Sequence, residues 1–175
     1  MSRAQVRSGI AAYFGGNTYD STDRVWTPTP LAAYGLATVR NYVPKRHPDS
    51  DFTRGLTVGR GMGTVMIVDL PQQIERRIAL GGPANGIKQD VYTVDLLLYH
   101  LAKVPHSEDA QADLDALIDA IVNWIHADRT LGGAVVDAGE TSAGIVKSLG
   151  QPLISGERTE IYASIRFDAN TYVNA

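Results

Sequence analysis

The chain has 175 residues and contains no cysteine. Disulfide bonds, thiolate metal sites and a cysteine nucleophile are therefore excluded as sources of stability or of chemistry. A chain of this kind fits an intracellular or a virion protein, because neither depends on disulfide cross-links in order to fold.

Long hydrophobic runs are also missing, since the longest apolar segments have the length of a β-strand. Such segments are too short to cross a bilayer as a helix. The apolar part of the segment MSRAQVRSGIAAYFGG is short and is interrupted by Arg7 and Ser8, so it does not have the pattern of a signal peptide. We expect a short helix there, ending at Gly15 and Gly16, with these residues on its buried side: Val6, Ile10 and Tyr13.

Motifs for catalysis or cofactor binding are lacking as well. The segment GRGMG (59–63) lacks G-x-G-x-x-G spacing and precedes a strand instead of a helix, so we predict no nucleotide site there. The segment GGPANGIK (81–88) is more typical of a hairpin connection than of an anion cradle. None of the four histidines has the i, i+4 spacing of helical zinc ligands. We therefore expect no catalytic residue, no cofactor and no metal.

The composition that is present is that of a globular domain, with 44% hydrophobic and 20% charged residues. We predict a single domain over residues 1–175, a length that allows a real core. The net charge of −3 is unevenly distributed: residues 1–68 hold eight Lys/Arg and four Asp/Glu, whereas residues 108–140 hold eight Asp/Glu and only Arg129. This asymmetry suits a subunit whose opposite faces meet different neighbours, and it equally suits ordinary solvated faces.

The clearest predicted element is a long amphipathic helix that begins at Ser107. Ser107 is a suitable N-cap, and carboxylates follow it in the first turn, where the helix dipole favours them. Gly132 and Gly133 are expected to end the helix. One face is predicted to be buried through Ala110, Leu114, Leu117, Ile118, Ile121 and Ile125. The opposite face is acidic, and its carboxylates are too widely spread to converge on one metal, so the helix is predicted to serve packing and assembly.

Hydrophobic patterning predicts strands between and after the helices. The expected strands cover residues 36–42, 64–70, 73–80 (after a turn at Pro71), 88–102, 134–137, 145–149 and 160–167. Within 73–80, Ile74, Arg76 and Ile78 alternate with their neighbours, and in the last strand the odd-numbered residues 161–167 are expected to face one way. Strands and helices do not alternate regularly, so a doubly wound parallel sheet is not expected. We predict an α+β fold in which the long helix and the short N-terminal helix pack on a mainly antiparallel sheet.

Residues without a structural explanation are candidates for subunit contacts. Residues 43–63 are predicted to form a long irregular loop, and such loops usually contact something. The predicted interface residues are Lys45 and Arg46 on this loop, Arg76 and Arg77 on opposite faces of a strand, and Asp128 and Arg129 after the long helix. Each of them also fits an ordinary exposed position.

Four segments, in order, resemble the tail terminator proteins of long-tailed phages, in the version found in phages of actinobacteria. The segments are GTVMIVDL, IERRIALGGPANGIKQDVYTVDLLLYHLA, IHADRTLGGAVVDAGE and FDANTYVNA. The resemblance covers most of residues 62–175 and weakly the N-terminal helix, and its most specific pieces are ERRIALGGP, ADRTLGG and FDANTYV. None of these pieces is a catalytic motif.

The resemblance implies a sheet with helices packed against it and a structural role at the tail–neck junction of a virion. Proteins of this family form a hexameric ring on the head-proximal end of the tail tube, stop its growth and join it to the head. The implied partners are further copies of the chain, the tail tube protein and a head–tail connector or head-closure protein. DNA would pass through the lumen without sequence-specific binding, and no membrane is involved. The subunit would be made in the cytoplasm of the host bacterium. We expect the acidic segment near the lumen or a seam between subunits.

Other interpretations remain open at this point. The chain also fits another neck or tail component, either a head-closure protein or the tube subunit, since these share small α+β folds and ring assembly. A small enzyme acting on a phosphorylated ligand would need a concave site with perturbed titratable groups. A nucleic-acid-binding module is disfavoured, because the chain is acidic and has no concentrated basic stripe.

Overall fold

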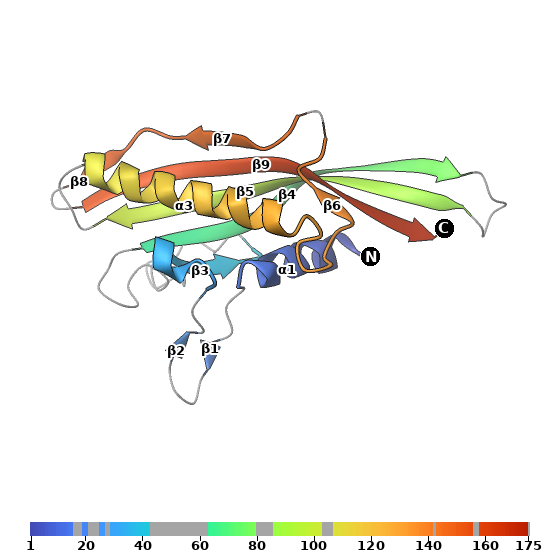
Figure 1. Cartoon of the computed structure of the whole chain (residues 1–175), viewed down its shortest axis with the longest axis horizontal. Helices are drawn as coiled ribbons and strands as arrows, with labels where there is room; N and C mark the ends of the chain where they lie inside the picture. Colours follow the sequence, from blue (N-terminus) through green and yellow to red (C-terminus); the bar gives the residue numbers. More distant parts are fainter. Residues whose placement is uncertain are drawn as a thin grey trace.

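The fold is known from a computed structural model, which describes residues 1–15, 19–20, 25–26, 29–42, 63–79, 86–102, 107–141, 143–155 and 158–174. Two α-helices, one short 3-10 helix and nine strands lie within these residues (Figure 1). The helices are α1 (Arg3–Tyr13), η1 (Ala32–Tyr34) and α3 (Ser107–Ala127). The strands are β1 (Tyr19–Asp20), β2 (Val25–Trp26), β3 (Leu36–Arg40), β4 (Gly63–Ala79), β5 (Ile87–Ala102), β6 (Asp137–Ala138), β7 (Val146–Leu149), β8 (Leu153–Ser155) and β9 (Arg158–Asn174).

Three long neighbouring strands form the centre of a seven-stranded sheet. Its order is β3-β4-β5-β9-β6, and β7 and β8 also pair with β9. The β3–β4 pair is parallel, and all the others in this sheet are antiparallel. The predicted α+β fold with a mainly antiparallel sheet is therefore confirmed.

The two α-helices, α1 and α3, contribute to one core together with β4, β5 and β9. The predicted apolar stripe of α3 is buried, and so are Val6 and Ile10 of α1, whereas Tyr13 is half-buried. On β9, burial alternates from residue to residue as predicted, since Ile165 and Phe167 are buried and Arg166 is exposed. The period of two expected for a half-buried strand thus identifies the face of the sheet on which the helices pack, here termed the core face.

The expected turn at Pro71 is wrong, because β4 continues through it without interruption. The pairing of β4 with β5 shifts between Asp69 and Gln72, so an irregularity in the strand accommodates Pro71. Proline has no N–H for the ladder and is tolerated at such bulges and at strand edges. The predicted strands 64–70 and 73–80 are therefore two halves of one strand.

The expected end of the long helix is also wrong by several residues. Helix α3 ends at Ala127, and the chain then turns through Leu131, Gly132 and Gly133, all of which have positive φ. The side chain of Asp128 accepts hydrogen bonds from the backbone N–H groups of Thr130 at 2.9 Å and Gly132 at 2.9 Å. A side-chain oxygen thus satisfies backbone donors before the glycines are reached, and the glycines shape the turn instead of ending the helix.

The C-terminal strands differ from the expectation in length and position. Strand β6 is two residues long and starts at Asp137, where the sequence predicted a strand over 134–137. Strand β9 extends to Asn174 instead of ending at 167, and β8 was not predicted. Several expectations lie wholly or largely outside the described residues: Gly16, the loop 43–63 apart from Gly63, the turn 81–86 apart from Gly86, and therefore both glycine-rich segments.

Candidate functional site

The most distinctive feature of the molecule is a three-stranded arm that projects from the helix-covered body (Figure 1). We define the arm as residues 72–79 of β4, 87–91 of β5 and 170–174 of β9. Along the arm β5 pairs with both β4 and β9, with one register shift in the β4–β5 pairing between Arg77 and Ala79. Residues 71–78 are all exposed, although they belong to the same strand as the buried residues 64–68. The β4 part of the arm is therefore exposed to solvent on both faces of the strand.

Apolar side chains gather on the face of the arm that points away from the core face, here termed the outer face. Ile74 pairs in register with Val91, and Arg76 pairs with Gln89, which in turn pairs with Tyr172. Paired residues share a face, and the exposed large side chains of this face are Ile74 (39%), Ile87 (44%) and Tyr172 (49%). Ile78 (55% exposed) is the extra residue where the register shifts, so that it and Ala79 together oppose Ile87, whose register partner is Ala79. Together these four residues form an apolar stripe with Arg76 inside it.

The base of the arm is fixed by polar contacts across the outer face of the sheet. Arg166 donates two hydrogen bonds of 2.6 Å to the two carboxylate oxygens of Asp95. Asp168 accepts from the hydroxyls of Thr93 and Thr141, each at 3.2 Å. Charge-assisted and hydroxyl bonds of this kind tie β5, β9 and the segment at Thr141 together next to the arm.

A buried polar cluster lies on the core face at the base of the arm. The Tyr92 hydroxyl donates to Asp90 Oδ2 at 3.5 Å, while Asp90 Oδ1 and Thr171 Oγ1 have no partner among the described residues. Burial raises the pKa of Tyr92, and the nearby carboxylate of Asp90 raises it further. The described residues contain no cluster of three or more His, Asp or Glu side chains that could hold a metal ion.

Helix α3 presents a second exposed surface, which is acidic. Its members are Glu108, Asp109, Asp113, Asp115 and Asp119, which we term the acidic face. Asp119 pairs with Lys147 of β7 at 2.7 Å, and the other four have no ion-pair partner among the described residues. Exposed Ala112 and Ala116 lie between Asp113 and Asp119 around the helix. Because alanine side chains are small, the acidic face carries little side-chain bulk between these carboxylates.

The predicted interface residues fall into three groups in the structure. Arg76 and Arg77 lie on the arm, on opposite faces of β4 as predicted, and no ion pair is formed by either within the described residues. Asp128 and Arg129 are used locally, since Asp128 holds the turn after α3 and Arg129 pairs with Glu140. Lys45 and Arg46 lie outside the described residues.

Hydrogen bonds also determine the ionisation of Asp128. The Thr130 hydroxyl, and then the backbone N–H groups of Gly132 and Thr130, lower the pKa of this carboxyl. These bonds are made within one turn of the chain, so they support a structural role for Asp128.

On the arm's outer face, sequence reasoning named Arg76 as an interface residue but missed its apolar neighbours Ile74, Ile78, Ile87 and Tyr172. The alternation of Ile74, Arg76 and Ile78 was recognised, but alternation alone predicts a half-buried strand. Only the structure shows that no described element covers this face. The sequence signal that could have indicated an exposed apolar face is an arginine, Arg76, at the same alternating positions as Ile74 and Ile78.

Comparison with known protein families and with curated proteins finds no match in either case. Within the described residues, no helix is both long and apolar enough to span a membrane.

His100 is a buried histidine next to the N-terminal part of α3. Its Nδ1 lies 2.8 Å from the Thr64 hydroxyl, while its Nε2 has no hydrogen-bond partner within the described part of the chain. Burial lowers the pKa of His100, and the carboxylate of Asp113 partly opposes this. The folded protein therefore holds His100 neutral to a lower pH than the unfolded chain does.

This difference predicts a loss of stability in acid. Below the unfolded pKa of about 6.5 the unfolded chain binds a proton that folded His100 resists, so the free energy of unfolding falls as the pH decreases. His100→Asn keeps a group that can bond Thr64 but does not titrate, so we expect a shallower decrease than in the wild type as the pH falls below about 6.5. Exposed His126→Asn is the control and should keep the wild-type slope in urea unfolding curves. If the free energy of unfolding falls equally steeply with decreasing pH in all three proteins, buried His100 is not the cause of the acid sensitivity.

Proposed function

We propose that this chain is a structural virion protein that forms a hexameric ring at the head-proximal end of a phage tail tube. The ring stops polymerisation of the tube and joins the tail to the head connector. The proposed partners are other copies of the chain, the tail tube protein and the connector or head-closure protein, with DNA passing through the lumen without sequence-specific binding. The proposed location is the tail–neck junction of the virion, and the proposed role is structural instead of catalytic.

The observation that carries this proposal is the presence of two unlike exposed surfaces on one small subunit. The arm carries an apolar stripe with Arg76, and α3 carries the acidic face, in a different part of the molecule. Unlike surfaces on one chain favour head-to-tail contacts, which close into a ring when the rotation per subunit is a whole fraction of a turn. An enzyme would instead be expected to have a concave site with convergent polar groups.

The resemblance to tail terminators adds a second line of support. Residues 75–79 of its first specific piece and 170–173 of its last belong to the arm. The middle piece, ADRTLGG, forms the turn after α3 that Asp128 holds together. Parts of these specific pieces are thus exposed, including Arg76 and Tyr172 on the arm, while others such as Phe167 belong to the core.

The oligomeric state of the purified protein tests the proposal. Light scattering over a range of concentrations is expected to give a mass about six times that of one chain, and negative-stain microscopy is expected to show closed rings. Long tubes formed by the chain alone would instead identify it as the tube subunit. A monomer at every concentration would contradict assembly into a ring.

A further inference from the structure

No element within the described residues covers the apolar stripe on the arm. Ile74, Ile78, Ile87 and Tyr172 are each exposed by more than a third of their surface and lie on adjacent strands. Contiguous apolar surface of this kind on a projecting element is typical of a protein–protein contact. The stripe therefore indicates a docking surface.

The face of the arm is better suited to docking than its edge. Beyond Ile67 no described strand pairs with the outer edge of β4, so backbone groups are available there. However, Glu75, Arg76 and Arg77 follow one another along this edge. Charged side chains on an edge strand oppose the addition of another strand. Docking is therefore expected through the side chains of the outer face.

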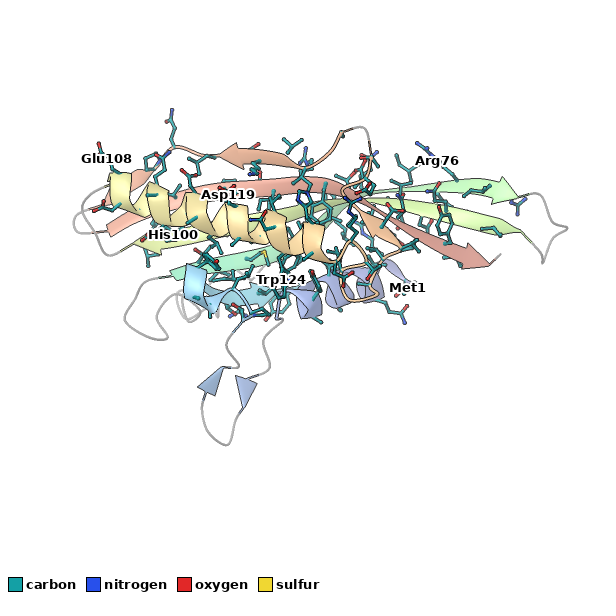
Figure 2. All side chains as sticks on the ribbon, in the orientation of Figure 1. Met1, Arg76, His100, Glu108, Asp119 and Trp124 are labelled. Carbon is teal, nitrogen blue, oxygen red and sulfur yellow. The ribbon has the colours of Figure 1, made fainter. Side chains whose placement is uncertain are left out.

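Charge complementarity identifies the occupant as a second copy of this chain. Arg76 lies within the apolar stripe and has no ion-pair partner among the described residues. Four carboxylates of the acidic face of α3 also have no ion-pair partner among these residues. Arg76 and Glu108 lie at opposite ends of the molecule (Figure 2). Helix α3 also packs on the core face, whereas the stripe is on the outer face. The two surfaces can meet only between different copies.

We infer that the outer face of the arm of one copy docks on the acidic face of α3 of the next copy. Exposed Ala112 and Ala116 leave room for the isoleucine side chains to approach the helix, and Asp109 and Asp113 are placed to pair with Arg76. The contact is heterologous, since each copy uses its arm on one neighbour and its helix on the other. This inference names the contact between neighbouring subunits of the proposed ring, and it rests on the proposed function for the number of copies.

Charge reversal on the two surfaces tests the contact. We expect Arg76→Glu to weaken self-association about tenfold or more, because it places like charges together within an apolar contact. The matched control is Arg77→Glu, which makes the same charge change on the opposite face of β4 and should assemble like the wild type. The readout is the apparent dissociation constant from light scattering or analytical ultracentrifugation.

A mixing experiment identifies the partner surface. The double variant Asp109→Lys/Asp113→Lys is also expected to lose assembly by itself. In an equimolar mixture with Arg76→Glu, the charge-reversed arm meets the charge-reversed helix, and the unchanged arm meets the unchanged acidic helix. Mixing should therefore restore wild-type assembly, and recovery would show that both variants are folded.

Each outcome bears separately on the contact and on the ring. Wild-type rings that persist in Arg76→Glu would overturn the docking but leave the proposed function standing. The docking is likewise overturned if Arg77→Glu disrupts assembly equally or if the mixture fails to assemble. A wild-type monomer would overturn both. A wild-type dimer or open filament that is broken by Arg76→Glu and restored by mixing would support the docking and contradict the ring.

Discussion

Replacing Phe167 with alanine is expected to lower the free energy of unfolding by about 3–5 kcal/mol. Phe167 lies on the long central strand β9, is 1% exposed and pairs in register with buried Val94 of β5. Removing its ring leaves a cavity between the sheet and the helices, because neighbouring elements can relax only partly. Urea denaturation followed by circular dichroism measures the loss.

The control for this prediction lies on the same strand. Tyr172 is also aromatic but is 49% exposed on the arm, so Tyr172→Ala is expected to change the free energy of unfolding of the subunit by less than about 1 kcal/mol. The measurement is made at a concentration where the protein is monomeric, because Tyr172 belongs to the proposed docking surface. Equal losses for the two variants would mean that the arm is part of the folded core.

Replacing Gly15 with alanine is the second substitution with a large expected effect, a loss of about 2–4 kcal/mol. Gly15 follows α1 with φ of +87°, and an added Cβ would lie 2.6 Å from Pro30 Cδ and 3.0 Å from Thr29 Cα. Alanine at this position would therefore adopt an unfavourable backbone conformation, and its Cβ would overlap with the Thr29–Pro30 segment. Thermal and urea unfolding measure the effect.

Gly35 provides a control that separates these two causes. Its φ is +88°, nearly the same as that of Gly15, but nothing lies within 4 Å of an added Cβ. Gly35→Ala should therefore lose only the conformational part, about 1–2 kcal/mol. If both variants lose the same amount, the close contact between Gly15 and the Thr29–Pro30 segment does not contribute to stability.

Local patterns were sufficient to predict the elements of the body. The apolar spacing of α3 and the alternation along residues 161–167 predicted which side chains are buried. They succeeded because α3 and β9 each pack one face on the same core, so sequence period and burial agree. The α+β class followed from the order of these elements.

Features that depend on long-range pairing could not be predicted. The Asp95–Arg166 pair joins residues 71 positions apart, and the register that brings them together is a property of the whole sheet. Continuation of β4 through Pro71 depends on a register shift against β5, which no local propensity encodes. Ile74 and Ile78 look like core residues in the sequence but are exposed in the described structure, because burial depends on which elements pack against a strand.

The most direct test of the central proposal is tube growth in the presence of this chain. Purified tail tube protein from the same virus is polymerised with increasing amounts of the chain, and tubes are measured by negative-stain microscopy. We predict that tubes become shorter as the chain is added and carry a ring at one end only. Unchanged tube lengths with bare ends, or incorporation of the chain along the tube wall, would contradict a terminating role.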